Sequence, residues 1–355
     1  MATVEALYGR DLNGVYYINA NLPAAPLRFA GPDQRPRWPA AVTGQPNPQR
    51  INQNITAAYV LQNQTVGYNY NPSASLEKQF RGGVFLKGAY NYGAARNTID
   101  PGSIASGSFN GNAIAADPNN PGLGLSSNAP GHRAIAALSV RREYLRLGAT
   151  TLSLFGEYAQ ANNVTPLGVG ANTSYVYGGD MTGDGAAGND LVYVPRDLGE
   201  TLNQVRFLPI AATATTRAFS AQEQALAWDA YINQDSYLRT RRGRYAERNA
   251  VFLPGVFRTD LSVAQEVFRP LAGRRNAVQL RLDVFNLTNA INQRWGVGRQ
   301  LVSNQPISYV STSAAGEPQF RLRVVNGQLI DRTFIRTATA NDVYRVQLGA
   351  RYTFQ

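Results

Sequence analysis

The stretch Val343–Phe354, VYRVQLGARYTF, decides the fold of this chain. Side chains of a β-strand point alternately to the two faces of its sheet. From Tyr344 onward, one face of this stretch is apolar and the other carries Arg, Gln, Gly and Thr. At about 3.3 Å per residue, such a strand is long enough to cross a bilayer at a tilt. Aromatic residues stand at both ends of the apolar face, as a membrane-spanning strand requires.

Seven other segments alternate in the same way, and with the terminal stretch they give eight strands. They are residues 2–8, 66–76, 84–94, 133–142, 150–160, 256–267 and 278–284. Long and short connections alternate strictly between them. The long ones are residues 9–64, 97–131, 161–253 and 286–342, and the short ones lie near 80–83, 144–148 and 269–275.

This pattern predicts an all-β fold, an antiparallel transmembrane outer-membrane β-barrel, in which long loops are extracellular and short turns periplasmic. The resulting strand directions sort the aromatic residues of the apolar faces by end. Tyr8, Tyr68, Tyr70, Tyr90, Tyr92, Tyr158, Phe257 and Tyr344 fall at the loop end, and Tyr144, Tyr352 and Phe354 at the turn end. Two aromatic girdles are typical of membrane interfaces. Residues 1–355 are therefore interpreted as a single barrel region in the bacterial outer membrane.

Composition excludes several classes of site. The chain has 355 residues, a net charge of +11, one histidine and no cysteine, which excludes disulfides, zinc thiolates and a thiol nucleophile. No apolar run is long enough for a transmembrane helix. The start, MATVEALYGRDLNG, lacks the pattern of a signal peptide, which an exported protein needs, so the protein is either cytosolic or a piece of a longer one. The basic run RTRRGR at 239–244 is interpreted as a solvated loop, not a nucleic-acid site.

The long loops carry a few local signals of their own. Short strands are expected at 14–18 and 51–61. Ser220 and Glu223 form a capping box that predicts a helix over 220–233. Asn326–Gly327 predicts a β-hairpin turn. Trp38, Trp228 and Trp295 lie in loops, where they either pack loops together or stack on a sugar or peptide ligand.

Six stretches resemble TonB-dependent receptors, in particular the Oar-like group. In chain order they are TVEALYGRDLNGVYYINANL, TVGYNYNPSASLEKQF, GGDMTGDGAAGNDLVYVP, RRGRYAERNAVFLPGVFRTDLSVAQ, LRLDVFNLTNAIN and the terminal VQLGARYTF. The resemblance implies a twenty-two-stranded barrel with an N-terminal plug, which takes up scarce nutrients with energy passed through TonB. Because the chain shows about eight strands and no plug, the resemblance implies the C-terminal arc of such a barrel. The chain ends in Gln355, where the family usually ends on the aromatic residue.

The resemblance also implies partners. They are outer-membrane lipid, the TonB complex through the missing plug, the barrel assembly machinery, and a small nutrient, peptide or glycan. Tyr352 and Phe354 are assigned to the assembly signal. Two alternatives stay open: a structural or adhesive surface protein that binds partners through its loops, and a free-standing eight-stranded barrel with a filled lumen. No nucleophile–base pair, metal cluster or phosphate loop is evident, so no enzyme activity is expected.

The segment Asp180–Asp190, DMTGDGAAGND, is the candidate ion site. Calcium binds oxygen ligands from tight, glycine-containing acidic loops, and the candidate ligands are Asp180, Asp184, Asn189 and Asp190. Leu191 stands where an EF-hand loop has its glutamate. The alternative is that these Asp and Gly residues only build turns, and no other cofactor is expected.

Charged residues on the polar strand faces are expected to face the lumen. They are Glu77, Lys87, Asp260, Glu266, Arg281, Asp283, Arg345 and Arg351. Glu77 with Lys87, and Glu266 with Arg281, are predicted to pair across short turns. Such ion pairs are favoured over contacts with a substrate.

Overall fold

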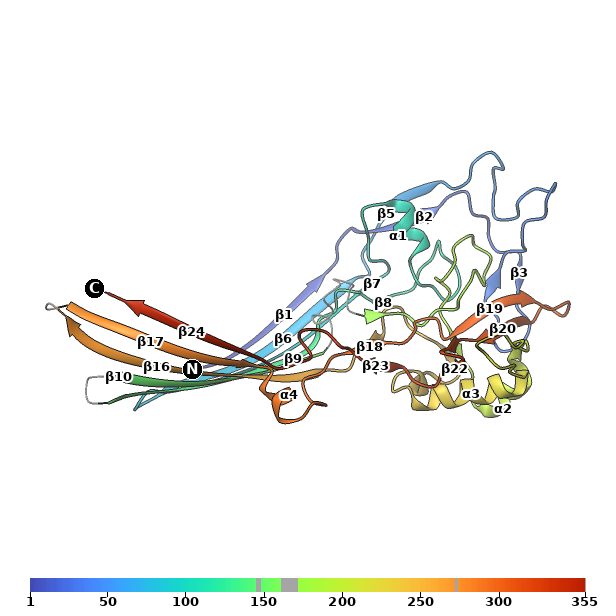
Figure 1. The fold of residues 1–355 in the computed structure, drawn as a ribbon. Coiled ribbons are helices and arrows are strands. Elements are labelled where there is room, and N and C mark those ends of the chain that lie inside the picture. The colour runs from blue at the N-terminus through green and yellow to red at the C-terminus, as the bar shows by residue number, and fades with distance from the viewer. Residues whose placement is uncertain (145–147, 161–171, 272–273, 355) are drawn as a thin grey trace.

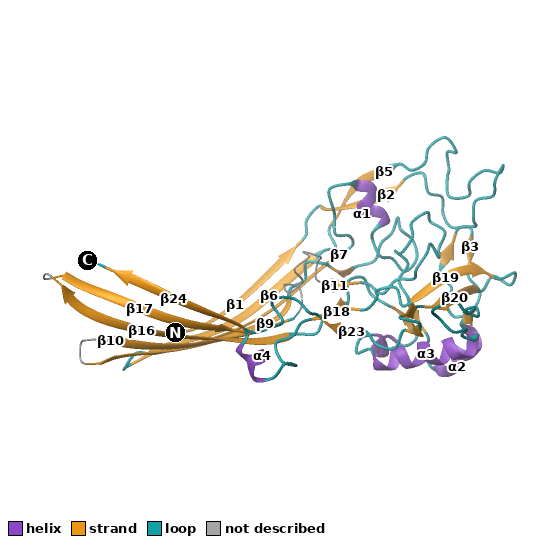
Figure 2. Ribbon diagram, viewed as in Figure 1, coloured by secondary structure: helices purple, strands orange, loops and turns teal. Residues whose placement is uncertain are grey.

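The computed structural model describes residues 1–144, 148–160, 172–271 and 274–354. The predicted turns at 144–148 and 269–275 fall partly outside these residues, as does the start of the loop 161–253. The described chain has two parts (Figures 1 and 2): a long curved sheet, and a loop body formed by residues 11–67, 98–130, 172–255 and 286–344. None of the described helices is long and apolar enough to cross a membrane.

Eight long strands form the sheet, and each is antiparallel to its neighbours. They lie in chain order, as expected when each connection joins adjacent strands. Their bounds are β1 Ala2–Arg10, β6 Tyr68–Phe80, β7 Val84–Asn97, β9 Gly131–Tyr144, β10 Gly148–Ala159, β16 Val256–Leu271, β17 Arg274–Phe285 and β24 Arg345–Thr353. All eight predicted strands are confirmed, although most are longer than the alternation alone indicated.

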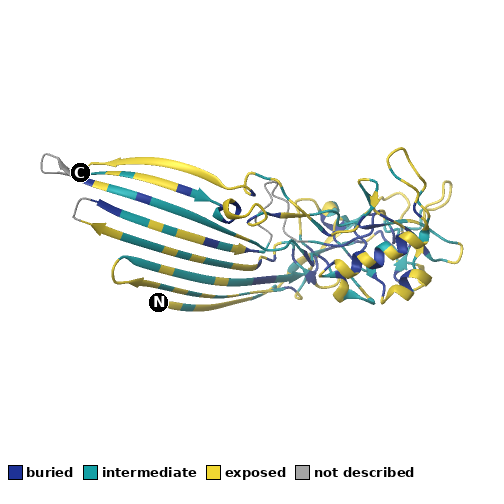
Figure 3. Ribbon diagram, turned by 60° about the horizontal axis from the view of Figure 1, so that its bottom comes forward, coloured by how far each residue is buried: buried dark blue, intermediate teal, exposed yellow. Residues whose placement is uncertain are grey.

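The two outermost strands leave the sheet open. Within the described residues, β1 is paired only with β6, and β24 only with β17. Both strands are exposed over most of their length, and the exposed C-terminal strand is evident in Figure 3. The closed eight-stranded barrel, in which β1 would pair with β24, is therefore wrong for this structure. The sheet is an arc with two free edges.

Register keeps apolar and polar residues on opposite faces across the whole arc. One apolar row runs over six strands through Val84, Val140, Leu152, Val263, Leu282 and Leu348. One residue along, a polar row on the other face runs through Ser139, Ser153, Ser262, Asp283 and Gln347. A shift of one residue in any strand would exchange these faces, so the alternation itself specifies the register.

One polar cluster interrupts the apolar face near the turn ends of the strands. Gln265 of β16 is opposite Thr150 of β10 and accepts a hydrogen bond of 2.7 Å from its hydroxyl. The same Gln265 donates to the hydroxyl of Tyr144. This glutamine departs from the predicted alternation, and its polar atoms are satisfied by two side chains on the same face.

The loop body contains short elements that hold its segments together. Its strands are β2 Gly14–Asn19, β3 Leu27–Arg28, β4 Pro36–Arg37, β5 Tyr59–Gln64, β8 Gly124–Leu125, β11 Asn172–Thr173, β12 Tyr193–Val194, β13 Arg206–Phe207, β14 Arg244–Tyr245, β15 Val251–Phe252, β18 Arg299–Leu301, β19 Ile307–Thr312, β20 Pro318–Leu322, β21 Val324–Val325, β22 Gln328–Leu329 and β23 Phe334–Arg336. Its helices are α1 Ala105–Asn110, α2 Leu198–Gln204, α3 Ala221–Gln234 and α4 Leu287–Ile291, with a 3-10 turn at Leu238–Arg241.

Local signals in the loops are largely confirmed. Helix α3 begins after Ser220, whose hydroxyl accepts from the Glu223 amide in a complete capping box. Asn326 and Gly327 both have positive φ and join β21 to β22 in the predicted hairpin. The strand expected over 51–61 is wrong in position, because β5 covers Tyr59–Gln64 and pairs with β2.

The main hydrophobic core lies in the loop body. Trp228, Tyr231 and Ile232 of α3 are fully buried against Tyr175 and residues from other loops. The core draws residues from the first, third and fourth long loops, between Phe29 and Ile330. Figure 3 shows the buried side of α3 and the mixed burial of the sheet strands. These three long loops therefore fold into one packed unit at the end of the sheet.

Candidate functional site

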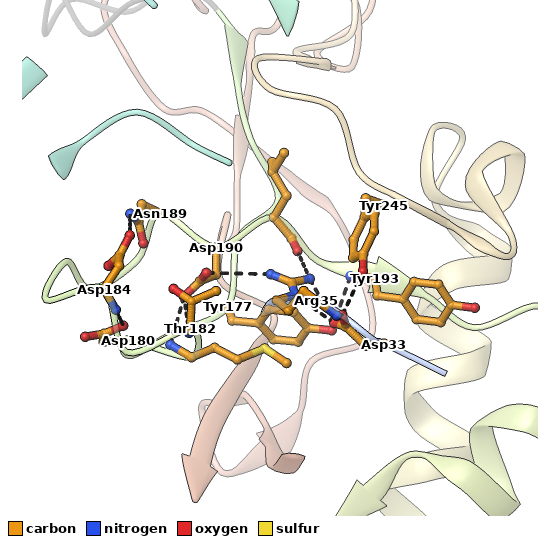
Figure 4. A network of polar contacts seen from close by, with 12 residues as sticks. Asp33, Arg35, Tyr177, Asp180, Thr182, Asp184, Asn189, Asp190, Tyr193 and Tyr245 are labelled. Carbon is orange, nitrogen blue, oxygen red and sulfur yellow. Dashed lines mark hydrogen bonds and ion pairs between the residues drawn. The ribbon is translucent and has the colours of Figure 1, made fainter. Parts of the chain in front are cut away.

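A buried arginine, Arg35, joins two of the long loops (Figure 4). Arg35 is 1 % exposed and lies between Asp33 and β4. Its Nε donates to both carboxylate oxygens of Asp33 at 2.9 and 3.0 Å, and a terminal nitrogen donates to the Leu191 carbonyl at 2.6 Å. The other terminal nitrogen is 3.6 Å from the Asp190 carboxylate. This guanidinium therefore ties the first loop to the segment that follows the candidate ion loop.

Aromatic rings complete the surroundings of Arg35. Its guanidinium carbon is 5.3 Å from the ring centre of Tyr177 and 4.9 Å from that of Tyr245, and the Tyr245 hydroxyl donates to Asp33 at 2.9 Å. Burial opposes the charge of Arg35, but the carboxylates of Asp33 and Asp190 outweigh it and raise the Arg35 pKa. Burial raises the pKa of Tyr177, so this ring stays neutral. A buried ion pair of this kind is costly to break from one side.

In the candidate ion loop, Asp180 is engaged by the backbone of its own turn. Its two carboxylate oxygens accept from the amides of Gly183, Asp184 and Gly185 at 2.7, 3.2 and 3.0 Å. Gly183 and Gly185 both have positive φ, which aims these amides inward. Asp180 therefore stabilises the turn, as the turn-building alternative requires.

The other candidate ligands are also hydrogen-bonded. Asp184 accepts from the Ala186 amide at 2.8 Å and from the Asn189 side chain at 3.1 Å. Asp190 accepts from the amides of Met181 and Thr182 at 2.8 and 3.1 Å. The side-chain oxygen of Asn189 and one oxygen of Asp190 are buried without a hydrogen-bond partner. The Asp190 oxygen is the one that forms the ion pair of 3.6 Å with Arg35.

Burial and mutual repulsion shift the acidity of this loop. Burial, with the charges of Asp190 and Asp180, raises the pKa of Asp184 to about 7. Burial likewise raises the pKa of Asp180 and of Asp190. In the part of the chain that the structure describes, no three acidic or histidine side chains are grouped around a metal position. The contacts fit turn building, and calcium binding by Asp180, Asp184, Asn189 and Asp190 stays a prediction.

Charges on the polar face of the sheet form cross-strand pairs. Glu77 and Lys87 are directly opposite, with 3.6 Å between their charged groups. Glu266 is opposite Gln279, not Arg281, and forms its ion pair of 2.8 Å with Arg141 of β9. The predicted pairing of Glu266 with Arg281 was wrong by two residues of register.

The remaining residues predicted to face the lumen also lie on this face. Arg281 forms an ion pair of 2.8 Å with Asp283 on its own strand, and Asp260 accepts from the Asn286 amide at 2.8 Å. Arg345 stacks on Phe285, with 5.6 Å from guanidinium carbon to ring centre, and Arg351 is opposite Gln279. These contacts make the polar face a network of charges and not a packed core.

The residues assigned to the assembly signal lie at the exposed end of the chain. Tyr352 donates to the Asn276 side chain at 2.8 Å, and its ring centre is 6.0 Å from that of Phe354. Both side chains are more than half exposed. They are therefore accessible at the open edge of β24.

Two pockets in the loop body were not predicted from the sequence. They have volumes of about 450 and 440 Å³, and both are lined by Ala113 and Arg248. Arg248 donates to the Asn112 side chain at 2.8 Å. Burial lowers the pKa of Arg248 to about 10, although the charge of Asp100 acts to raise it. The first pocket is lined mainly by Ser, Gly, Asn and Asp residues, which suits a small polar ligand. No local motif marks Arg248, because its partners lie far away in the sequence.

The three tryptophans have different surroundings. Trp38 and Trp228 are 3 % and 1 % exposed, so both pack loops together. Trp295 is 53 % exposed. Only this tryptophan is free to meet a ligand or a membrane surface.

Comparison with known proteins agrees with this geometry. A family model described as an outer membrane beta barrel domain matches residues 7–322. No curated protein and no solved structure matches the chain. The match spans most of the antiparallel sheet and nearly all of the loop body. This chain belongs to the outer-membrane β-barrel domain family and is a protein of the bacterial outer membrane.

Proposed function

We propose that the protein is a TonB-dependent transporter that takes up a scarce nutrient, and that these residues form the C-terminal arc of its barrel. The observation that carries the proposal is the open arc with a charged polar face. An arc with free edges at β1 and β24 needs further strands before its backbone groups are satisfied in lipid. A barrel of more strands encloses a wide lumen, and a polar, ion-paired wall suits such a lumen or a plug inside it.

The loop body is the proposed place of nutrient capture. Its pockets around Arg248 are lined by hydroxyl, amide and charged groups on a rigid, packed framework. Such sites fix the orientation of small polar ligands through a few placed donors and acceptors. The proposed ligand is a small polar nutrient, a peptide or a glycan, and the protein acts by transport, not by catalysis.

The proposed partners follow from this function. The TonB complex would supply energy through a plug, and the barrel assembly machinery would recognise the end of the chain at Tyr352 and Phe354. Outer-membrane lipid surrounds the apolar face. A structural or adhesive role is the second candidate, because the loop body is large and well packed enough to bind a partner at the cell surface.

Uptake in cells separates the two functions. Strains lacking this gene, lacking tonB, or lacking both are compared for uptake of labelled iron chelates, oligosaccharides and peptides at limiting concentration. The transporter proposal expects at least one nutrient whose uptake falls equally in all three strains. A loss of surface attachment that is independent of tonB, with every uptake unchanged, would favour the adhesive role.

A further inference from the structure

Three arginines without partners line one pocket at the loop end of β16. The pocket has a volume of about 470 Å³, and Arg294, Arg299 and Arg336 line it together with Trp295 and Phe257. No Asp or Glu is among the described residues that line it. Within the described residues, no ion pair or side-chain hydrogen bond is formed by the three guanidinium groups, and all three residues are exposed.

The register of two short strands forces two of these charges together. Strands β18 and β23 are antiparallel, and Arg299 is directly opposite Arg336. Like charges in directly opposite positions destabilise a strand pair. A nearby carboxylate could neutralise these charges, but none lies among the described residues that line the pocket. An anion bound between the two guanidinium groups would offset this repulsion.

The location of the pocket identifies the environment of that anion. Phe257 is on the apolar face of β16 and is opposite Tyr158 of β10. Both rings belong to the girdle expected at the extracellular interface of the membrane. Trp295 adds a third, half-exposed aromatic ring beside the arginines. Aromatic rings next to arginines at the ends of membrane-spanning strands are placed at the depth of lipid headgroups.

We propose that this pocket binds the phosphate of a lipid headgroup in the outer leaflet of the outer membrane. Arginine is suited to this ligand because its planar fork binds phosphate oxygens bidentately. The aromatic rings would contact the adjoining apolar part of the lipid. A soluble anion would use only the charges, whereas a lipid uses both the charges and the rings. The inference is independent of what the barrel transports.

Binding is measured on the protein extracted from outer membranes in a neutral detergent, by native mass spectrometry and by titration with defined lipids. Phosphatidic acid is the test lipid, phosphatidylcholine the zwitterionic control of zero net charge, and inorganic phosphate the soluble control. The variant Arg299→Gln with Arg336→Gln removes the opposed charges. The matched control, Arg321→Gln with Arg323→Gln, removes two exposed charges elsewhere in the loop body.

We expect phosphatidic acid to bind the native protein at least tenfold more tightly than phosphatidylcholine, and inorganic phosphate to bind far more weakly. The Arg299/Arg336 variant should lose at least tenfold in affinity for phosphatidic acid, with its thermal midpoint in lipid-free detergent unchanged or higher. The control variant should bind as the native protein does. Equal binding of both lipids, equal binding by the two double variants, or binding of phosphate as tight as that of the lipid would overturn the proposal.

Discussion

Replacing Leu348 by arginine tests which face of the sheet meets lipid. Leu348 is in the middle of β24 and is opposite Leu282 in the apolar row. Its side chain is 80 % exposed in the described structure, so no protein contact masks the effect of the substitution. Its neighbour Gln347 points to the polar face, opposite Asp283. The two positions therefore lie on opposite faces of the sheet but at nearly the same depth in the membrane.

The expected magnitude follows from that difference. An arginine on the lipid face near mid-membrane costs about 2–4 kcal/mol of unfolding free energy. At Gln347 the same side chain meets the carboxylate of Asp283 and gains roughly 0.2–1 kcal/mol from an opposite-charge pair. A third variant, Leu226→Arg on the exposed side of α3, should change stability by no more than about 0.5 kcal/mol. A cost of 2 kcal/mol lowers the folded-to-unfolded ratio by about 30-fold.

The measurement is a urea titration of the gene's whole product, extracted from outer membranes and refolded into phospholipid vesicles. The folded fraction is read from the shift in migration between unheated and heated samples on a gel. Equal costs at Leu348 and Gln347 would refute the assignment of the two faces. Equal costs at Leu348 and Leu226 would mean that the apolar face meets water.

Four further predictions use other parts of the chain. Because the native chain has no cysteine, Gly122→Cys should react with an impermeant maleimide in intact cells and Arg81→Cys should not; the reverse pattern would invert the topology. Residues 1–355 exported on their own behind an added signal peptide should aggregate or pair edge to edge, because β1 and β24 are unpaired, and a compact heat-modifiable monomer would contradict the open arc. The native Asp184 binds protons more tightly than an unfolded Asp, so stability should fall as pH rises from about 4 to 7, and Asp184 contributes at most about 1.4 kcal/mol per pH unit. The thermal midpoint of Asp184→Asn should show a smaller slope, because Asp180 and Asp190, whose pKa values burial also raises, remain. At pH 8, 5 mM calcium should raise the thermal midpoint of the native protein but not that of Asp184→Asn. Equal midpoints of the native protein in calcium and in a chelator would show that the loop is a turn and binds no calcium.

The sheet could be predicted from the sequence because the patterns that specify its strands and their register lie within short segments of the chain. Alternation with period two places the apolar row of Leu282 and Leu348 on one face, and each short turn sets the register of its two strands. The pairing of Glu77 with Lys87 followed directly from the turn at 80–83. The error at Glu266 arose beside the turn near 269–275, where the number of residues in the turn decides which side chains are opposite. Gln265 was missed because its partners come from a different hairpin.

The candidate sites of the loop body could not be predicted in the same way. Arg35 donates to the Leu191 carbonyl across 156 positions of sequence, and Arg248 donates to Asn112 across 136. Neither arginine stands in a motif that specifies its partner. The acidic loop Asp180–Asp190 was recognisable by composition, but its role depended on which backbone amides its carboxylates accept from. Pairing of Arg299 with Arg336 likewise depends on a register between two short strands that no alternation marks.

The joint packing of three long loops determines what an antibody can recognise on the surface of this protein. The core that includes Tyr175, Trp228 and Phe320 is assembled from segments far apart in the chain, and β13 is paired with β20 of a different loop. Neighbouring exposed residues therefore come from different loops, so most epitopes on the folded protein are discontinuous. Sera raised against the intact protein should bind peptides from single loops poorly, and a vaccine antigen would have to present the loop body folded.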